Sequence, residues 1–326
     1  MMGWVDIART CAAAACAALV ATTAMAQDPV RIERIQAAFD AWTAEHAAKG
    51  TGAIAYEGDV IGTLDSGIDP ATPIELASLS KAITGVCVRV LFEEGTLHYN
   101  DSTVTLLDRD PPATVGQLMT HSAGFADDVT QRAMPGWLGD PTHRAAEAAD
   151  MLQGADGPPN TFIYNNANYA LLALMIEKVT GTTYEEACRS RVLDPLGITT
   201  AKPSPQSGAF LSWGGWSMTS EDYARFHAHW FGATVPTGFD PRGQPNVDLG
   251  ENVFYGTGTL FRSYNRRYNF WHHGSLCILD GLEVGAFAVT WEAKWTLVVG
   301  YDKCLPWDAL FALDAALTEA VYGAIE

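Results

Sequence analysis

The chain has 326 residues, a hydrophobic fraction of 48% and a formal net charge of −18, with an isoelectric point near 4.7. An acidic balance of this size argues against nucleic acids and anionic membrane surfaces as partners, because both repel a negatively charged protein. The acidic residues are scattered along the chain, so solubility is the simpler reason for them.

Residues 1–26 have the features of a secretory signal peptide. A short opening with one arginine precedes the apolar run TCAAAACAALV, and the small residues AMA stand directly before Gln27. The apolar run is too short to span a bilayer comfortably. We therefore expect residues 1–26 to be removed and the protein to be exported, to the periplasm or outside the cell. A retained N-terminal anchor is the alternative, and we expect no later membrane-spanning segment.

The next part of the chain predicts a helix, a strand pair and a second helix. Residues 28–48 follow an amphipathic helical pattern, and residues 50–68 read as two short strands around a turn. Residues 78–94 have apolar side chains at helical spacing and stop before Gly95.

The helix over residues 78–94 carries a serine and a lysine that can meet. Ser78 and Lys81 lie off the apolar face, one turn apart. Lys81 shares its side of the helix with Val88 and Phe92, which predicts apolar surroundings for its ammonium group. Burial lowers the pKa of a lysine, and a neutral lysine can take the proton of a serine hydroxyl. The alternative is a lysine that extends into solvent, and Ser-x-x-Lys by itself is modest evidence.

Residues 96–232 are predicted to be mostly helix and loop, with prolines as breakers. A strongly apolar helix begins near Asn168 and is closed by Gly181. Tyr164 and Asn166 precede it, and a phenol can shuttle protons while an amide can hold a substrate carbonyl. The alternative is a packed aromatic residue followed by an N-cap asparagine.

Strands return after residue 250, over 255–264, 268–274, 285–292 and 295–303, and a helix follows over 307–324. His272, His273 and Gly274 are predicted at the end of a strand, where a glycine lets substrate approach the backbone closely. The alternative is a pair of ordinary surface histidines.

Strands at both ends of the chain therefore enclose a helical middle. We predict an α/β (α+β) fold with one antiparallel sheet assembled from both chain ends, flanked by the terminal helices, and with an inserted helical lobe. We expect a single domain over residues 27–326, with a sheet lobe over 27–95 and 250–326 and a helical lobe over 96–249. The junction between two lobes is a common place for a substrate pocket.

Four of the six cysteines follow the signal peptide. Cys87 and Cys188 lie in helical patterns and read as buried thiols. Cys277 and Cys304 lie in the strand-rich part and are candidates for a disulfide, although spacing alone does not fix the pairing.

Metal and cofactor sites are not expected. His227, His229, His272 and His273 are not accompanied by an H-E-x-x-H helix or by a carboxylate at ligand spacing. There is no glycine-rich phosphate loop either. His121 and Ser122 invite a Ser–His interpretation, but no G-x-S-x-G elbow accompanies them.

Ser-x-x-Lys, Tyr-x-Asn and a late triplet that ends in glycine follow one another in the chain. This ordered series resembles the serine β-lactamase and penicillin-binding-protein superfamily, and within it the class C β-lactamase, DD-peptidase and family VIII esterase branch. Further stretches agree with the resemblance and come in the family's order, namely LFEEGTLHYNDSTV, TVGQLMTHSAGF, VLDPLGIT, GGWSMTSEDYARF and YGTGTL.

The resemblance implies a role for each of these residues. Ser78 would be the acyl-forming nucleophile, with Lys81 as its base or proton relay. Tyr164 would pass protons to the leaving group and activate the deacylating water. Asn166 would bind the substrate carbonyl, and the backbone N–H groups of Ser78 and Ser275 would form the oxyanion hole. Whether Lys81 or Tyr164 is the base stays open, and the stretch around His121 would be a structural turn.

The triplet His272-His273-Gly274 departs from the Lys-Thr-Gly of many relatives. A permanent positive charge is replaced by a group that titrates near neutrality. His273 also removes a short hydrogen-bond donor and should narrow the pocket. Both changes count against efficient β-lactam hydrolysis.

The sequence thus predicts an exported serine hydrolase that acts on amides or esters through a Ser78 acyl-enzyme. DD-peptidase or D-aminopeptidase-like activity ranks level with carboxylesterase activity, and true class C-type β-lactamase activity ranks below them. Expected partners are small molecules or short peptides, including peptidoglycan-derived ones. The rival from another class is a non-catalytic protein that binds peptidoglycan fragments or a protein partner.

Overall fold

The computed structural model describes residues 29–232, 240–264, 267–278 and 281–324. The signal peptide predicted over residues 1–26 lies outside the described residues. Within them, no helix combines the length and the apolar character that crossing a membrane requires.

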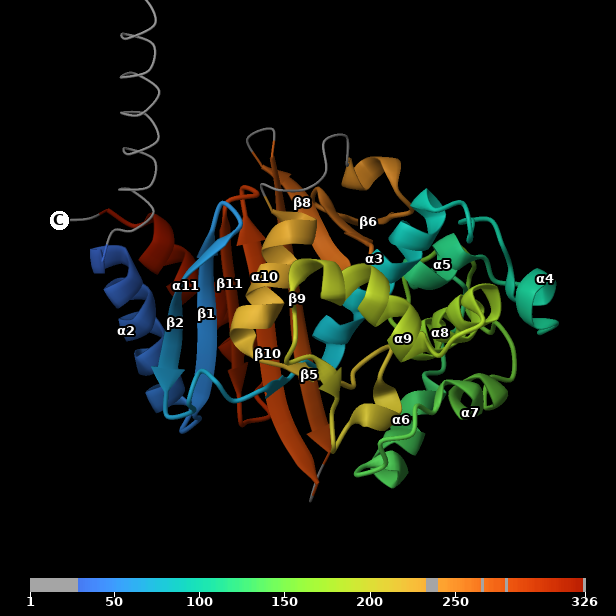
Figure 1. Cartoon of the computed structure of the whole chain (residues 1–326), viewed down its shortest axis with the longest axis horizontal. Coiled ribbons are helices and arrows are strands. Elements are labelled where there is room, and N and C mark those ends of the chain that lie inside the picture. The colour runs from blue at the N-terminus through green and yellow to red at the C-terminus, as the bar shows by residue number, and fades with distance from the viewer. Residues whose placement is uncertain (1–28, 233–239, 265–266, 279–280, 325–326) are drawn as a thin grey trace, which may run out of the picture.

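An eight-stranded antiparallel sheet forms one half of the molecule, with the strand order β2-β1-β11-β10-β9-β8-β7-β6 (Figure 1). Strands from the two ends of the chain meet where β1 pairs with β11, with Gly50 opposite Tyr301. The strands are β1 (Gly50–Tyr56), β2 (Asp59–Ser66), β6 (Val247–Gly250), β7 (Val253–Gly256), β8 (Thr259–Tyr264), β9 (Arg267–Ile278), β10 (Leu282–Trp291) and β11 (Trp295–Tyr301). The predicted sheet from both chain ends is confirmed.

Helices cover both faces of this sheet because its central strands are apolar on both sides. Ile54, Phe287 and Val299 pack in the cluster that includes α2 (Pro29–Glu45) and α11 (Trp307–Tyr322). The neighbouring Ala53 and Val298 belong to the larger cluster on the other face, since consecutive strand residues point in opposite directions. There α10 (Ser220–Phe231) contacts β1, β10 and β11. Helix α10 thus packs on the sheet, although its residues fall in the range expected for the helical lobe.

The rest of the chain forms a helical region beside the sheet (Figure 1). Its α-helices are α4 (Thr103–Leu107), α5 (Val115–Met119), α6 (Val129–Ala133), α7 (Ala145–Asp150), α8 (Ala167–Thr180) and α9 (Tyr184–Cys188). A small sheet accompanies them, with β3 (Ile74–Glu75), β5 (Trp216–Met218) and β4 (Lys202–Pro203) in this order. Helix α8 ends where Gly181 adopts the left-handed conformation with φ of 70°.

The segment that begins with Ser78 lies at the junction of the two regions. Residues Ala77–Leu79 form the 3₁₀ turn η1, and α3 (Ser80–Glu93) follows directly. Turn η1 contacts β9 and β10, whereas α3 contacts α8 and α9. Every residue of α3 from Ser80 to Arg89 is buried. The first turn of α3 is therefore held by the sheet on one side and by the helical region on the other.

The triplet His272-His273-Gly274 lies in the middle of β9, not at its end. Strand β10 continues the pairing as far as Leu282 opposite Ile278. Glycine often ends a strand, but pairing with β10 continues the extended conformation past Gly274. The prediction of a strand end at Gly274 is wrong for this reason.

Candidate active site

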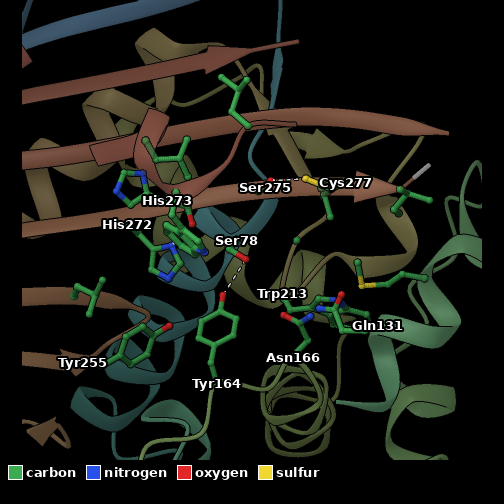
Figure 2. Close-up of a pocket in the computed structure, with 18 of the residues that line it drawn as sticks. Ser78, Gln131, Tyr164, Asn166, Trp213, Tyr255, His272, His273, Ser275 and Cys277 are labelled. Carbon is green, nitrogen blue, oxygen red and sulfur yellow. Dashed lines mark hydrogen bonds between the residues drawn. The ribbon is translucent and has the colours of Figure 1, made fainter. Parts of the chain in front are cut away.

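Ser78, Lys81 and Tyr164 meet at the junction of the sheet and the helical region. Lys81 Nζ donates a hydrogen bond to Ser78 Oγ at 3.0 Å. The Tyr164 hydroxyl donates to the same oxygen at 2.9 Å (Figure 2). The hydroxyl of Ser78 is thus contacted by an amine from α3, the helix that follows it, and by a phenol from the loop before α8. This geometry suits the activation of a serine nucleophile.

The ammonium group of Lys81 is withdrawn from solvent, since the residue is 0% exposed. Its Nζ donates to the Trp213 carbonyl at 2.8 Å and lies 4.8 Å from the Tyr164 ring centroid and 5.7 Å from that of Tyr169. Burial lowers the pKa of Lys81 from 10.5 to about 7. The amine is therefore substantially neutral near pH 7 and can accept a proton.

The apolar surroundings of Lys81 differ from those that the sequence indicated. Val88 is buried, but Phe92 is 38% exposed and stacks on Tyr99 at a centroid distance of 4.2 Å. The rings that shield Lys81 are those of Tyr164 and Tyr169, which come from the helical region. The prediction of a buried lysine is right, whereas its explanation by neighbours on the same helix is wrong, because residues distant in the chain supply the shielding.

Tyr164 is partly exposed, and its hydroxyl contacts the candidate nucleophile. The residue is 39% exposed, yet its oxygen lies against Ser78 Oγ. Burial raises the pKa of Tyr164 above its usual value of 10. The phenol thus keeps its proton near neutrality and acts as a donor toward Ser78.

His121 holds the backbone on both sides of Tyr164. The Ile163 N–H donates to the His121 carbonyl at 2.8 Å, and the Asn165 N–H donates to His121 Nδ1 at 3.2 Å. Asn168 Nδ2 also lies 3.2 Å from this nitrogen, and the imidazole ring lies 4.4 Å from the ring of Tyr164. Burial, with a smaller effect of Lys81, keeps the pKa of His121 well below 6.5. The ring is therefore neutral with its proton on Nε2, because Nδ1 accepts.

The resemblance implies a structural turn at His121 in preference to a Ser–His pair, and its φ of 54° fits a turn. Its contacts with residues around Tyr164 span more than 40 positions in the chain. Chain spacing carries no signal for such a contact.

Asn166 precedes α8 and lines the cavity beside Ser78 (Figure 2). Its side chain makes no capping hydrogen bond. Other side chains accept from the backbone N–H groups at the start of α8. Asn165 Oδ1 accepts from Ala167 N at 2.9 Å, and Asp128 Oδ2 accepts from Asn166 N at 3.2 Å. The capping alternative is thus not observed, and the Asn166 amide is left facing the cavity.

His272 and His273 lie on opposite sides of β9, as strand geometry requires (Figure 2). The His272 ring lies 6.2 Å from the Tyr164 ring and 6.0 Å from the Tyr255 ring. Burial, followed by the nearby Lys81, lowers the pKa of His272 to about 3. The expectation that His272 titrates near neutrality is wrong, because the site is too dry to favour the charged ring.

The His273 ring stacks on Phe287 at 4.4 Å and meets Trp307 edge-on at 5.9 Å. Burial lowers the pKa of His273 to about 4. The ring lies across β9 from Ser78 (Figure 2), although His273 is among the residues that line the cavity. The narrowing of the pocket by His273 stays a prediction.

Gly274 allows close contact between β9 and the turn that carries Ser78. A Cβ atom at this position would lie 2.5 Å from the Leu76 carbonyl oxygen and 3.2 Å from the Ser78 nitrogen. The glycine therefore allows β9 to pack closely against this turn, and its role in the approach of substrate stays a prediction. Ser275 follows directly in β9, which brings its backbone to the same junction as that of Ser78.

A cavity of about 890 Å³ opens at Ser78. Tyr255 and His272 lie on one side of Ser78, and Gln131 and Cys277 lie on the other (Figure 2). The lining residues are Ser78, Gln131, Met134, Pro135, Phe162, Tyr164, Asn166, Trp213, Gly214, Leu249, Tyr255, Leu260, His272, His273, Ser275, Leu276, Cys277, Ile278, Leu305, Trp307 and Leu310.

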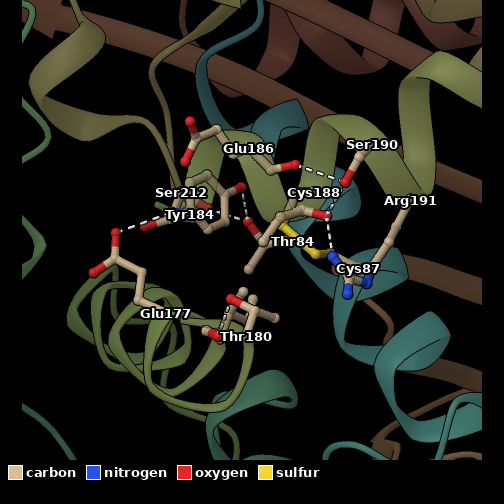
Figure 3. Close-up of a disulfide and its surroundings, with 12 residues drawn as sticks. Thr84, Cys87, Glu177, Thr180, Tyr184, Glu186, Cys188, Ser190, Arg191 and Ser212 are labelled. Carbon is tan, nitrogen blue, oxygen red and sulfur yellow. Dashed lines mark hydrogen bonds between the residues drawn. A yellow bond between two sulfur atoms is a disulfide. The ribbon is translucent and has the colours of Figure 1, made fainter. Parts of the chain in front are cut away.

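Two disulfides join cysteines of the described residues. Cys277 and Cys304 are bonded, in line with the pairing considered from sequence. Cys87 of α3 is bonded to Cys188 of α9 across 101 positions (Figure 3). The interpretation of Cys87 and Cys188 as free buried thiols is wrong, because the two helices pack side by side, which the chain spacing did not reveal. Disulfides are typical of oxidising compartments.

With this geometry established, comparisons with known proteins identify the family. The model of the Beta-lactamase family matches residues 35–281. The chain therefore belongs to the Beta-lactamase family, a family of serine hydrolases, and its resemblance to that superfamily is confirmed.

Three similar proteins illustrate this relationship. Penicillin-binding protein 4* of Bacillus subtilis (strain 168) is 29% identical over 187 residues, which are 51% of this chain and 40% of that protein. Penicillin-binding protein 4 of Amycolatopsis lactamdurans is 30% identical over 190 residues, 52% of this chain and 49% of that one. The chain thus matches less than half the length of these relatives.

The crystal structure of the D-amino acid amidase from Ochrobactrum anthropi SV3 complexed with D-phenylalanine superposes with a TM-score of 0.72. It is 18% identical and covers 90% of this chain and 99% of that chain. This likeness shows that the fold is shared.

Proposed function

We propose that this protein is an exported serine hydrolase that works through an acyl-enzyme on Ser78. One observation carries the proposal: Ser78 Oγ accepts hydrogen bonds from both Lys81 Nζ at 3.0 Å and the Tyr164 hydroxyl at 2.9 Å, and Lys81 is wholly buried. Burying the ammonium group of a purely structural lysine costs free energy, because the charge loses its hydration. For a lysine that acts as a base, the same burial is useful, because it makes the amine neutral near pH 7.

In the acylation step, neutral Lys81 takes the proton of Ser78 as Oγ attacks the substrate carbonyl carbon. The negative charge that develops on the carbonyl oxygen is stabilised by the backbone N–H groups of Ser78 and Ser275. The bond to the leaving group then breaks. Tyr164 gives its proton to the leaving atom and regains one from Lys81, so the leaving group departs neutral and Lys81 returns to the amine.

Hydrolysis of the acyl-enzyme reverses these proton transfers. A water molecule takes the place of the leaving group and loses a proton to the pair Tyr164 and Lys81. The released acid leaves Ser78, which recovers its own proton. Asn166 holds the acyl carbonyl side of the substrate during both steps, because its amide faces the cavity.

We assign Lys81 as the base because the two candidate groups differ in ionisation. Burial lowers the pKa of Lys81 to about 7 and raises that of Tyr164. At neutral pH the amine is the group able to accept a proton, and the phenol is the group able to donate one.

The substrates are amides or esters of small compounds. The similarity to penicillin-binding proteins and to a D-amino acid amidase supports peptidase-like activity. The neutral His272, in place of a lysine, supports ester substrates without a carboxylate. Efficient β-lactam hydrolysis ranks below both for the same reason.

Labelling with an alkyl fluorophosphonate tests the proposed nucleophile. Intact mass should show one covalent adduct, absent in Ser78→Ala and strongly slowed in Lys81→Met. Ser122→Ala, which removes a nearby serine outside the triad, is the matched control and should label normally. An unlabelled wild-type protein, or equal labelling of Ser78→Ala, contradicts the proposal and favours a non-catalytic binding protein.

We also propose export after removal of residues 1–26, leaving a single catalytic domain from Gln27. The two disulfides support an oxidising destination. N-terminal sequencing of the protein from the periplasm or medium should begin at Gln27. Recovery of an unprocessed protein in the cytoplasm contradicts export.

A further inference from the structure

The cavity at Ser78 is uncharged. Among the described residues that line it, none is an Asp, Glu, Lys or Arg. The two lining histidines are neutral, because burial lowers the pKa of His272 to about 3 and that of His273 to about 4. The described part of the wall thus offers a substrate no ion-pair partner.

Two charged groups next to the catalytic residues, Lys81 and Asp128, are hydrogen-bonded within the protein. Lys81 is 0% exposed and donates to Ser78 and to the Trp213 carbonyl. The Asp128 carboxylate accepts from Thr130 N at 3.1 Å and from Asn166 N at 3.2 Å. Both groups bond to other residues of the site, and neither is among the residues that line the cavity.

The cavity extends on both sides of Ser78, and the two sides have different roles in the proposed reaction. Tyr164 gives a proton to the leaving atom, so the leaving group lies on the side of Tyr164 and Tyr255. The acyl group then extends along β9 in the other direction. Four apolar lining residues follow in that direction: Met134 and Pro135 come directly after α6, which carries Gln131, and Leu276 and Ile278 lie in β9 beyond Ser275.

A charged substrate group is disfavoured in such a cavity. A carboxylate or an ammonium group that enters it loses hydration and finds no partner of opposite charge. The formal net charge of −18 adds a long-range repulsion for anions. The cavity therefore selects against both signs of charge, whereas an apolar chain gains free energy by leaving water.

From this we propose that the site hydrolyses uncharged esters with an apolar acyl chain, which lies along Met134, Leu276 and Ile278. The inference rests on the proposed function and narrows its substrate class. The ester C–O bond breaks as Ser78 Oγ takes up the acyl group, and the alcohol leaves with a proton from Tyr164. Water then hydrolyses the acyl-enzyme and releases the carboxylic acid.

Three esters that differ only at the end of the acyl chain test the proposal. They are p-nitrophenyl hexanoate, its analogue with a terminal carboxylate and its analogue with a terminal ammonium group. The leaving group and the reacting carbonyl are the same in all three. We expect kcat/KM for the neutral ester to exceed both charged analogues by about 100-fold or more, the effect of one unpaired charge in a dry site.

A charge placed in the acyl side provides the second measurement. Gln131 is exposed on α6 and lines the cavity, so Gln131→Arg adds a cation there. We expect it to improve kcat/KM for the carboxylate ester relative to hexanoate by roughly tenfold, and to worsen the ammonium ester. Gln153→Arg, at an exposed position outside the lining, makes the same change in net charge and should leave the ratios unchanged.

Labelling of Ser78 by the alkyl fluorophosphonate separates the two proposals. No adduct on Ser78 overturns the proposed function together with this inference. An adduct with similar turnover of all three esters, or with no turnover of the neutral ester, overturns the substrate class alone. Equal effects of Gln131→Arg and Gln153→Arg overturn the placement of the acyl chain.

Discussion

Lys81 shows how a single residue becomes reactive through its position. Its amine donates hydrogen bonds to Ser78 Oγ and to the Trp213 carbonyl, and it lies against the rings of Tyr164 and Tyr169. None of these contacts carries a negative charge, so the amine gains little from remaining protonated. Asp128 favours the charged form but less than burial opposes it.

The pH dependence of acylation should follow Lys81. Because burial lowers its pKa to about 7, kcat/KM should rise as pH increases through 7 and then level off. No decline is expected at moderately alkaline pH, since the pKa of Tyr164 is raised. Lys81→Met should lower kcat/KM by roughly 10²–10⁴-fold and abolish the rise. A flat wild-type profile between pH 6 and 9 contradicts Lys81 as the base.

His121 should act as a positioning residue for Tyr164. His121→Leu removes the acceptor for the Asn165 N–H and leaves this buried donor unpaired, at a cost of about 1–3 kcal/mol. We expect kcat to fall more than KM rises, because the phenol loses its fixed place.

Asparagine tolerates a positive φ and offers an oxygen near the place of Nδ1. His121→Asn should therefore recover much of the lost kcat, and thermal unfolding of both variants separates activity from stability. Equal kcat in His121→Leu and His121→Asn rules out the positioning role.

At the scale of elements, α3 is tied to its neighbours at several points. The Cys87–Cys188 disulfide joins it to α9, and beside this bond Thr84 Oγ1 lies 2.6 Å from the Tyr184 hydroxyl (Figure 3). Gly85 lies against the backbone of the β7–β8 turn at Thr257, where a side chain would clash. These contacts hold the helix that presents Lys81 between strands and helices.

The Cys87–Cys188 disulfide should stabilise the protein more than Cys277–Cys304. It closes a loop of 101 positions, compared with 27 for the other pair. The longer loop lowers the entropy of the unfolded chain further, which adds about 1 kcal/mol to the free energy of unfolding. Its loop also contains Tyr164, so its loss should reduce activity as well.

Urea unfolding of the two double alanine variants measures the free energies of unfolding. Under reducing conditions the wild type should no longer have a higher free energy of unfolding than the two variants. A larger loss in the Cys277/Cys304 pair contradicts this prediction.

At the scale of the whole molecule, burial of neutral histidines links folding to pH. His227 and His272 are buried and His143 is partly buried, and desolvation lowers the pKa of each to about 3. The unfolded chain binds these protons near its ordinary pKa of about 6.5, whereas the folded chain excludes them until about pH 3. The folded state is therefore favoured above pH 6.5 and loses stability as pH falls toward 3.

Each of these histidines should contribute about 1.4 kcal/mol per pH unit to the loss of stability in acid. Urea unfolding at pH 7, 5 and 4 measures this slope. His143→Gln should reduce it by about one such increment, whereas the matched change His98→Gln, at an exposed position, should not. An unchanged slope in His143→Gln contradicts the linkage.

The sequence by itself determined the order of the elements, the sheet built from both chain ends and the family. Strand alternation and helical periodicity are local patterns, and the motifs around Ser78, Tyr164 and His272 stand in a fixed order along the chain. These features need no knowledge of distant contacts. The same local information identified Ser78, Lys81 and Tyr164 as candidates.

Tertiary structure alone decided the environment of each group. The shielding of Lys81 by Tyr164 and Tyr169, the contacts of His121 around Tyr164, and the bond between Cys87 and Cys188 all join residues far apart in the chain. The neutrality of His272 is of the same kind, since its pKa depends on how many atoms exclude water from the ring. Desolvation is a property of the packed interior, and chain spacing does not encode it.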